Sequence, residues 1–221
     1  MHKFNITLLL ALFMLSCGNP APESKTAKTQ VEANSTKKII LFFGDSLTAG
    51  YGLDDPAQAF PGVIAAKIDS LKLPYKVINA GVSGETTAGG LARTDWILKQ
   101  KPDVFVLELG ANDGLRGVPV SETRKNLQAI ISKVTSKYPK TTIILTGMQV
   151  PPNMGTAYTV EFKNIFPALA KTNNIRLVKF LLEGVGGRPE LNQADGIHPT
   201  TTGAKILAKN VWEVLEPELS K

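Results

Sequence analysis

The sequence contains only one cysteine and two histidines, and both scarcities restrict its chemistry. A single cysteine, Cys17, excludes disulfides within the chain and any metal site built from several cysteines. His2 lies at the extreme N-terminus in what reads as a removable leader. The fold must therefore be held by packing, and any imidazole chemistry has to use His198.

Several nucleotide-binding and hydrolase motifs are also absent. Neither G-x-x-x-x-G-K-[ST] nor G-x-G-x-x-G occurs, which weakens an interpretation as a phosphate- or dinucleotide-binding protein. The G-x-S-x-G elbow of α/β-hydrolases is missing, because residues 81–85 read Gly-Val-Ser-Gly-Glu and do not fit it.

The excess of positive charge, formally +6, does not form a nucleic-acid-binding pattern. The lysines are spread along the chain instead of being gathered into a basic stripe with interleaved aromatic residues. We therefore expect a solvated, mildly basic surface and no nucleic-acid partner.

The N-terminus reads as an export signal. Lys3 precedes an apolar run over residues 6–15 that is too short to span a bilayer. Cys17 follows this run directly and resembles the lipidated cysteine of bacterial lipoproteins, although Met14 and Leu15 match that pattern imperfectly. The alternatives are an ordinary exported protein and a buried cysteine.

The next segment, residues 18–37, is rich in Pro, Ser, Thr, Lys and Gln. With almost no apolar content it cannot offset its ordering entropy by burial, which predicts a flexible linker. Residues 1–17 are thus predicted to be a lipoprotein-type signal peptide. The predicted location is the periplasm or the outer membrane of a bacterium, with the protein bound to the membrane by a lipid anchor.

From residue 38 onward, compact apolar runs alternate with longer amphipathic stretches. This alternation is typical of βαβ units around a parallel sheet covered on both faces. The predicted strands are 39–43, 76–79, 104–109, 142–146 and 176–180, and the predicted helices are 56–71, 87–99, 120–138, 159–172 and 201–215. The sequence predicts one domain over 38–221, an α/β three-layer αβα sandwich with a five-stranded parallel sheet.

Polar turns follow the strands, and ligands bind outside the carboxyl ends of the strands in open parallel sheets. Ser46 follows the first predicted strand, where its hydroxyl would be exposed. This position suits a nucleophile, but equally a helix N-cap; a phosphate-binding turn and plain turn chemistry are further interpretations.

Three further turns supply complementary groups. Gly81 can bring a backbone N–H close to a ligand, and Asn112 can supply a side-chain N–H to the same oxygen. Asp195 lies three residues before His198, within reach of the imidazole Nδ1, although Asp-Gly is also common turn chemistry. Jointly, these turns would meet at one rim of the sheet.

Together, the segments around Ser46, Gly81, Asn112 and Asp195–His198 resemble the four blocks of the GDSL/SGNH hydrolase superfamily. Within it, residues 44–53, 90–93, 108–117 and 195–199 are most similar to the bacterial thioesterase I/arylesterase/lysophospholipase group, and the similarity covers roughly residues 38 to 215. The resemblance implies a flavodoxin-like fold. It also implies a serine esterase that needs no metal or cofactor.

The resemblance assigns a role to each residue. Ser46 is implied to be the nucleophile, His198 the general base and then acid, and Asp195 the orienting carboxylate. Ser46, Gly81 and Asn112 are implied to form the oxyanion hole.

The substrate is less well specified. We expect a small acyl ester, of short to medium chain or aryl type, with lysophospholipids and acyl thioesters as further possibilities. Apolar segments that would line an acyl groove are Leu115 and Val118, residues 148–155 and residues 181–185. Leu115, Arg116, Val150 and Pro151 are the predicted substrate-binding residues. A carbohydrate O-acetyl esterase, a catalytically silent surface-tethered binding module and a nucleotide-binding flavodoxin-like module are the alternatives, and the sequence does not indicate an oligomeric state.

Overall fold

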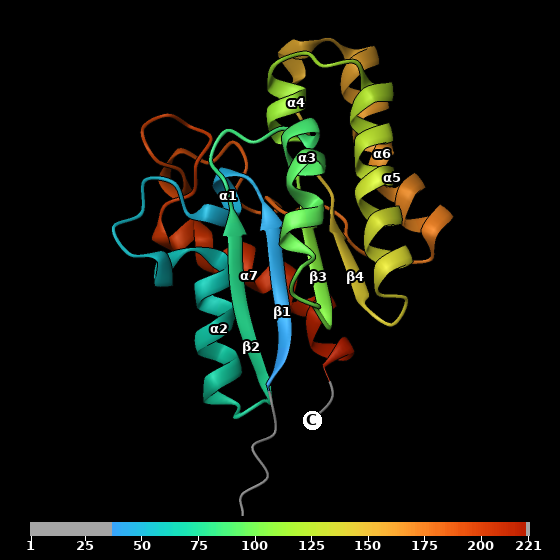
Figure 1. Ribbon diagram of the computed structural model, residues 1–221. Helices are drawn as coiled ribbons and strands as arrows, with labels where there is room; N and C mark the ends of the chain where they lie inside the picture. The colour runs from blue at the N-terminus through green and yellow to red at the C-terminus, as the bar shows by residue number, and fades with distance from the viewer. Residues whose placement is uncertain (1–36, 220–221) are drawn as a thin grey trace, which may run out of the picture. The chain divides into compact units, whose positions relative to one another are not determined.

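Five apolar segments form one parallel sheet in the computed structural model, which describes residues 37–219 (Figure 1). The strand order is β2-β1-β3-β4-β5. The strands are β1 (Lys38–Gly44), β2 (Tyr75–Gly81), β3 (Val104–Glu108), β4 (Thr142–Thr146) and β5 (Arg176–Val178). The predicted signal peptide, its Cys17 and most of the predicted linker lie outside the described residues.

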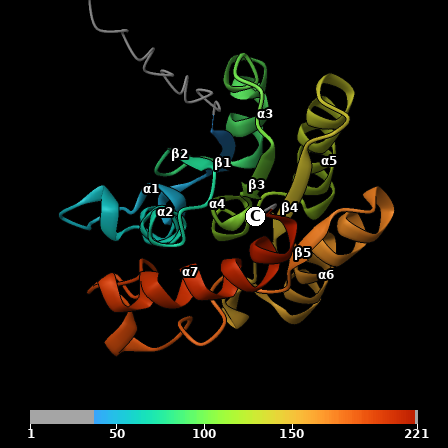
Figure 2. The ribbon, with the colours of Figure 1, turned by 90° about the horizontal axis from the view of Figure 1, so that it is seen from below.

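Helices cover both faces of this sheet, as Figures 1 and 2 show. The longer helices are α2 (Phe60–Ser70), α3 (Thr87–Ile97), α5 (Val120–Lys137), α6 (Thr156–Asn173) and α7 (Thr201–Leu215). Helix α5 packs against α3 and α6 on one face, and α2 packs against α7 on the other. The predicted three-layer αβα sandwich with a five-stranded parallel sheet is therefore confirmed.

The composition of the strands explains their burial. The β1 segment Lys-Ile-Ile-Leu-Phe-Phe-Gly is buried from Ile40 to its end, and every residue of β3 is buried. Such continuous apolar runs are typical of parallel strands that have helices on both faces. At the carboxyl end of β1, Gly44 pairs with Gly81 of β2 and with Glu108 of β3. This register brings the turns that follow three strands to one rim.

Several predicted boundaries differ from those of the structure, which ends β2 at Gly81 instead of residue 79 and α3 at Ile97 instead of residue 99. The helix predicted over 56–71 is divided by the extended residue Ala59 into a 3₁₀ turn η1 (Pro56–Gln58) and α2. Strand β5 stops at Val178, because Gly147 bonds both to the Val178 carbonyl and to the Leu181 N–H, which leaves the two intervening residues outside the ladder. Helix α6 begins three residues before its predicted start, at Thr156.

Two short helices at the carboxyl rim escaped prediction. Helix α1 (Ser46–Ala49) follows β1, and α4 (Ala111–Leu115) follows β3. Helices of four or five residues are too short to show a 3.6-residue hydrophobic period. Further 3₁₀ turns are η2 (Pro152–Met154), η3 (Pro189–Leu191) and η4 (Glu216–Glu218).

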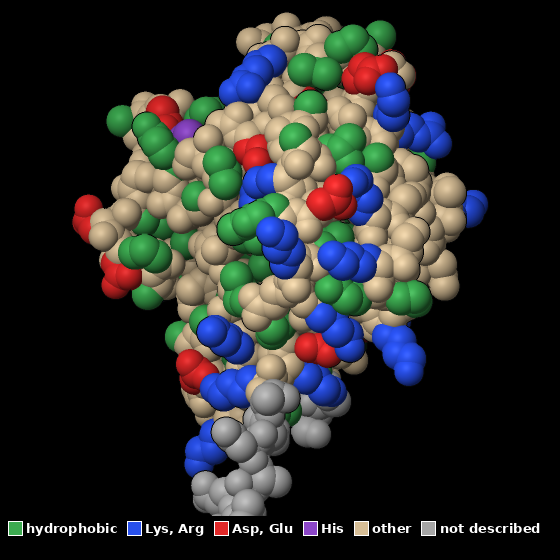
Figure 3. All heavy atoms as spheres, viewed as in Figure 1, with side chains coloured by type: hydrophobic (Ala, Val, Ile, Leu, Met, Phe, Trp, Pro, Cys, Tyr) green, Lys and Arg blue, Asp and Glu red, His purple; other side chains and the backbone are tan. Residues whose placement is uncertain are grey.

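The surface in Figure 3 carries Lys and Arg side chains that are spread over this face, with Asp and Glu among them. Within residues 37–219, no helix combines the length and the apolar content needed to cross a membrane.

Candidate active site

Ser46 is the first residue of α1, directly after the strand β1 has ended at Gly44. Asp45 caps this helix, since its Oδ1 accepts the N–H of Leu47 over 3.0 Å, and Gly50 closes it with a left-handed φ of 80°. The helix-cap interpretation of Ser46 is therefore wrong. Its own N–H, at the first helical position, has no acceptor within the helix.

Ser46, His198 and Asp195 form a chain of hydrogen bonds. His198 Nε2 lies 2.9 Å from Ser46 Oγ, and His198 Nδ1 lies 2.7 Å from Asp195 Oδ2. Asp195 Oδ1 also accepts the backbone N–H groups of Ile197 and His198, each over 3.0 Å. The structure thus brings together the three residues that the sequence suggested for the triad.

The hydrogen bonds to Asp195 have an electrostatic consequence. The hydrogen bond with the His198 ring, followed by those from the two backbone N–H groups, lowers the pKa of Asp195 to about 2. An ionised Asp195 favours the imidazole tautomer that carries its hydrogen on Nδ1, which leaves Nε2 free to accept the Ser46 proton.

The histidine loop is attached to the loop that follows α1. Gln193 donates from its side chain to the carbonyls of Tyr51, over 2.7 Å, and Pro199, over 3.0 Å, and its N–H bonds to the His198 carbonyl. The Tyr51 ring lies 4.6 Å from the His198 ring, centroid to centroid. These contacts fix the imidazole relative to Ser46, although the two residues are far apart in sequence.

For Gly81, the structure differs from the prediction. The Gly81 N–H donates to Asn79 Oδ1 over 3.0 Å, and Gly81 does not line the cavity beside Ser46. A Cβ at this position would lie 2.2 Å from the backbone nitrogen of Ala49, so glycine is required there for α1 to pack on β2. Gly81 serves packing, and its N–H is not available to an oxyanion.

Gly84 occupies the place that Gly81 was predicted to take. It lines the cavity together with Ser46 and Asn112, and it has a left-handed φ of 79°. No acceptor among the described residues bonds to its N–H. The sequence contained a signal for this residue, because Gly84 belongs to the same glycine-containing turn after β2.

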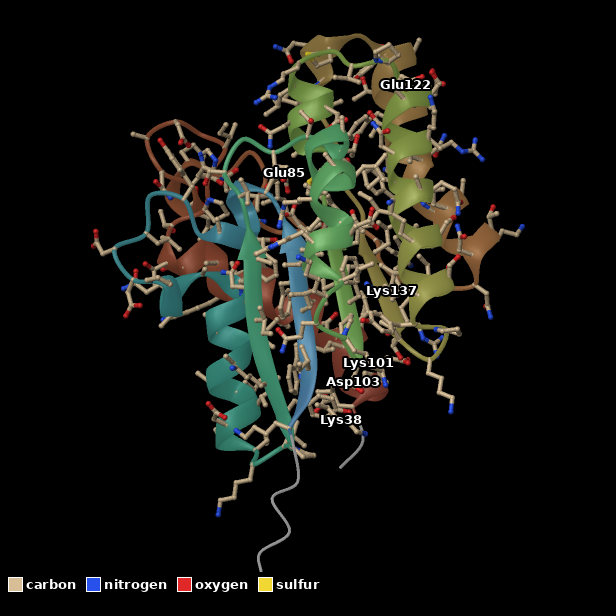
Figure 4. All side chains as sticks on the ribbon, viewed as in Figure 1. Lys38, Glu85, Lys101, Asp103, Glu122 and Lys137 are labelled. Atoms are coloured by element: carbon tan, nitrogen blue, oxygen red, sulfur yellow. The ribbon has the colours of Figure 1, made fainter. Side chains whose placement is uncertain are left out.

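Asn112 lines the same cavity from the start of α4. Its Nδ2 lies 3.1 Å from Asp45 Oδ2 and 3.1 Å from the carbonyl oxygen of Glu85. Figure 4 shows Glu85 at the carboxyl end of the sheet, near the end of β2 and the start of α3. Two acceptors from different turns therefore orient the Asn112 carboxamide.

Glu85 is itself fixed by Arg93 of α3. Arg93 makes a two-pronged contact with the Glu85 carboxylate, with Nε 2.6 Å from Oε1, and donates to the Ala80 carbonyl over 2.9 Å. The guanidinium carbon lies 4.0 Å from the centroid of the Phe43 ring. Because both charged side chains are largely buried, this pair anchors the turn that carries Gly84 and Glu85.

Two carboxyl groups lie buried beneath Ser46. Asp45 and Glu108 are both fully buried, and Glu108 Oε2 lies 3.2 Å from the Asp45 nitrogen. Burial raises the pKa of Asp45 to about 6 against the opposing effect of its hydrogen bonds, and burial together with the Asp45 charge raises the pKa of Glu108 well above its usual value. Sequence reasoning assigned no role to either residue.

A cavity of about 530 Å³ opens beside Ser46 and His198. Its apolar wall includes Leu47, Leu115, Met148, Val150, Pro151 and Leu182. Three of the four predicted substrate residues therefore line it. Arg116 does not, because its guanidinium turns to the Gly84 carbonyl, to which it donates over 2.9 Å.

Curated relatives align with this chain over most of its length. It is 40% identical to the esterase TesA of Pseudomonas aeruginosa over 183 residues, which cover 82% of this chain and 90% of the relative. It is 36% identical to an arylesterase of Vibrio mimicus, with 85% and 92% covered, and 37% identical to the thioesterase 1/protease 1/lysophospholipase L1 of Escherichia coli, with 80% and 83% covered.

Solved structures agree in fold. The crystal structure of TesA matches with a TM-score of 0.78 at 39% identity, over 82% of this chain and 100% of the other. The SGNH-hydrolase family esterase AlinE4 matches with a TM-score of 0.68 at 41% identity, over 84% and 98%. Residues 42–206 match the model of the GDSL-like lipase/acylhydrolase family. The chain therefore belongs to the GDSL-like lipase/acylhydrolase family, the GDSL/SGNH hydrolases.

Proposed function

We propose that this protein is a serine esterase that hydrolyses short- to medium-chain acyl or aryl esters through an acyl-enzyme intermediate on Ser46. The reaction class rests on the relatives, which make the chain a carboxylic-ester hydrolase. The proposed mechanism rests on one observation, the hydrogen-bonded chain from Asp195 through His198 to Ser46 at the mouth of an apolar cavity.

In the first half of the reaction, Ser46 Oγ attacks the ester carbonyl carbon while its proton passes to His198 Nε2. The carbonyl oxygen becomes an oxyanion. When the tetrahedral intermediate collapses, the C–O bond to the leaving alcohol breaks and the His198 imidazolium protonates that oxygen. Asp195, ionised because its pKa is about 2, stabilises the imidazolium in between.

In the second half, water replaces the alcohol. A water molecule attacks the acyl-enzyme carbonyl as His198 Nε2 takes its proton, and the imidazolium then returns a proton to Ser46 Oγ as the acid departs. Free enzyme is restored, and the net reaction consumes one ester and one water. A thioester would follow the same steps with a thiol as leaving group.

The oxyanion would be bound by three N–H donors: the backbone N–H of Ser46, the backbone N–H of Gly84 and Nδ2 of Asn112. Neither of the first two has a hydrogen-bond acceptor within residues 37–219, which supports their availability to a ligand. Asn112 Nδ2 already faces Asp45 and Glu85, so one of its hydrogens would be shared with the oxyanion. Gly84 thus takes the role first predicted for Gly81.

The apolar character of the cavity supports acyl or aryl substrates over carbohydrate esters. A carbohydrate O-acetyl esterase would need a polar cleft with aromatic platforms, and the aromatic residues that line this cavity are Tyr51 and Phe180. Tyr51 is already in contact with His198.

Hydrolysis of a p-nitrophenyl ester series from acetate to palmitate tests the proposal, with Ser46→Ala as control. We expect a maximum at short or medium chains and complete loss in the variant. Activity confined to acetate would favour the carbohydrate deacetylase instead. Inertness toward every ester, together with no labelling of Ser46 by a fluorophosphonate, would favour the silent binding module.

We also propose that Cys17 is lipidated after export, as the leader sequence predicts. Mass spectrometry of the protein from a membrane fraction tests this, with Cys17→Ala as control. A diacylglyceryl-modified cysteine at the mature N-terminus is the expected result, and an unmodified cysteine in a soluble fraction would contradict it.

A further inference from the structure

Glu108, at the end of β3, is a buried carboxyl group that the proposed mechanism does not use. Its Oε2 accepts two hydrogen bonds from the turn that carries Ser46, one from the Asp45 N–H over 3.2 Å and one from the Thr48 hydroxyl over 2.8 Å. Its Oε1 is buried and has no hydrogen-bond partner among the described residues. A buried carboxylate oxygen without a donor is unfavourable.

The turn is built closely around this carboxyl. A Cβ at Gly44 would lie 2.5 Å from Glu108 Oε2 and 2.1 Å from Thr48 Oγ1. Glycine at this position therefore leaves the space in which Glu108 meets Thr48. Glu108 does not line the cavity, and its hydrogen bonds within the described residues go to Asp45 and Thr48, so any influence on catalysis must pass through the turn.

The charged groups around Glu108 do not compensate a second negative charge. The Asp45 carboxyl is buried beside it. Arg93 is already paired with Glu85, and its Nη2 donates to the Ala80 carbonyl over 2.9 Å and to the Gly44 carbonyl over 3.4 Å. The charge of His198 lowers the pKa of Asp45. Two ionised carboxylates in one buried site repel each other, so the pair retains a proton.

The hydrogen bonds indicate where that proton lies. Both Asp45 oxygens accept N–H groups, from Leu47 at 3.0 Å and from Asn112 at 3.1 Å, as a carboxylate does. Glu108 accepts through one oxygen only, and its other oxygen is free to carry a hydrogen. Burial, followed by the Asp45 charge, raises the pKa of Glu108 well above its ordinary value, in agreement with this assignment.

We propose that Glu108 is a positioning residue that works as a neutral carboxylic acid, with its proton on Oε1 while Oε2 holds the turn from Gly44 to Thr48 in place. The inference rests on the proposed esterase function, because the turn it holds carries the Ser46 hydroxyl and the Ser46 N–H. The neutral form satisfies both donors of the turn and adds no second charge beside Asp45. The Asp45 carboxylate is the acceptor for the Glu108 hydroxyl, since the side-chain hydrogen bond between the two raises the pKa of Glu108 and lowers that of Asp45.

Two substitutions of the full-length protein test the positioning role, with a medium-chain p-nitrophenyl ester as substrate. Glu108→Gln keeps an oxygen acceptor and is permanently neutral, so we expect kcat within about threefold of the wild-type value. Glu108→Ala leaves both donors unpaired, and the displaced turn should lower kcat by about 10- to 100-fold with KM almost unchanged. A Gln variant as impaired as the Ala variant would overturn the proposal, and so would an Ala variant with full kcat.

Infrared spectroscopy tests the protonation state of Glu108 independently of activity. It uses Glu108→Gln as the variant, so the test does not require Glu108→Ala to fold. At neutral pH the wild-type protein should show the carbonyl stretch of a protonated carboxyl, shifted in D₂O. The band should vanish in Glu108→Gln and persist in Asp45→Asn. A missing wild-type band, or one lost in Asp45→Asn, would contradict the proposal.

Ser46→Ala distinguishes a failure of the proposed esterase function from a failure of the proposed role of Glu108. If Ser46→Ala hydrolyses the ester as fast as the wild-type protein, the proposed function fails. If Ser46→Ala is inactive and Glu108→Gln is also inactive, the esterase mechanism stands and the role of Glu108 as a neutral acid is wrong.

Discussion

Asn112 donates a side-chain hydrogen bond to Asp45 over 3.1 Å, so the residue that precedes the proposed nucleophile helps to orient a proposed oxyanion donor. The contact joins the turn after β1 to the start of α4. It needs an acceptor on Asp45, and a carboxylate supplies two, one for Leu47 and one for Asn112.

Asp45→Asn should reduce kcat without unfolding the protein. Asparagine caps helices as well as aspartate does, but its NH₂ group would face the NH₂ group of Asn112. We expect a loss of about 10- to 100-fold in kcat in ester hydrolysis. Asp55→Asn is the matched control, because Asp55 caps the exposed turn η1 in the same way. Equal losses in both variants would contradict the prediction.

Asp195→Asn should leave the fold intact and lower kcat by about 10⁴-fold, since the amide would favour the wrong His198 tautomer. The wild-type carboxylate has a pKa of about 2, so it stays ionised in any assay above pH ~4. Its stabilising effect on the fold is present above the ordinary pKa of 3.8 and is lost as the pH falls through 2. Steady-state kinetics of Asp195→Asn check the predicted loss of kcat. Asp69→Asn, which alters an exposed surface pair, is the control.

The difference in unfolding free energy between the wild type and Glu108→Gln should depend on pH in a defined direction. The raised pKa means that the folded protein retains a proton that the unfolded chain releases above its ordinary pKa of 4.5. Wild-type stability therefore decreases as the pH rises above that value, by at most about 1.4 kcal/mol per pH unit from this group. Urea unfolding should give similar free energies of unfolding for the variant and the wild type near pH ~4. At neutral pH the variant should be the more stable of the two. A difference that does not change with pH would count against a buried neutral acid.

Arg93→Lys should weaken both the fold and catalysis. A lysine ammonium cannot contact both Glu85 oxygens and the Ala80 carbonyl while stacking on a ring. Impairing this buried pair should cost about 2–4 kcal/mol of unfolding free energy, and kcat should fall because the Glu85 carbonyl orients Asn112. In Arg176→Lys, which alters a pair with Glu218 in which the arginine side chain is 60% exposed, we expect a change below about 1 kcal/mol. Denaturant titrations of the two variants give the comparison.

Leu182→Trp should shift the preferred ester toward shorter acyl chains. Leu182 lines the cavity and is half-buried, so a larger side chain would occupy space that the acyl chain needs. The p-nitrophenyl ester series should show the loss growing with chain length, while acetate hydrolysis changes little. Leu71→Trp, at an exposed position after α2, is the control and should leave the profile unchanged. An unaltered profile in Leu182→Trp would place the acyl chain elsewhere.

The sequence predicted the sheet, its five main helices and the three residues of the proposed triad, because continuous apolar runs and short polar turns leave a clear pattern. Choosing between Gly81 and Gly84 required three-dimensional information. Both glycines lie in one turn, and only the close approach of Ala49 to Gly81 and the bond from Gly81 to Asn79 distinguish them. Arg116 was likewise misplaced, since a sequence does not show that its side chain turns to the Gly84 carbonyl.

The role proposed for Glu108 is a second feature that could not be predicted from the sequence. In the sequence it is one charged residue at the end of an apolar run, and its partners Asp45 and Thr48 are about 60 residues away along the chain. The register of β1 against β3 places them together, and no local pattern reports that register.

The chain enters the sheet at Lys38, the amino end of β1, whereas Ser46 follows its carboxyl end; Figure 4 shows Lys38 at the end of the sheet opposite to Glu85. Seven residues of strand, at about 3.3 Å each, separate the two ends. The chain therefore enters the described domain at the end of the sheet remote from the proposed catalytic residues. A purification tag, a surface linkage or a fused partner can be attached there, and the delivery of the enzyme can change independently of its chemistry.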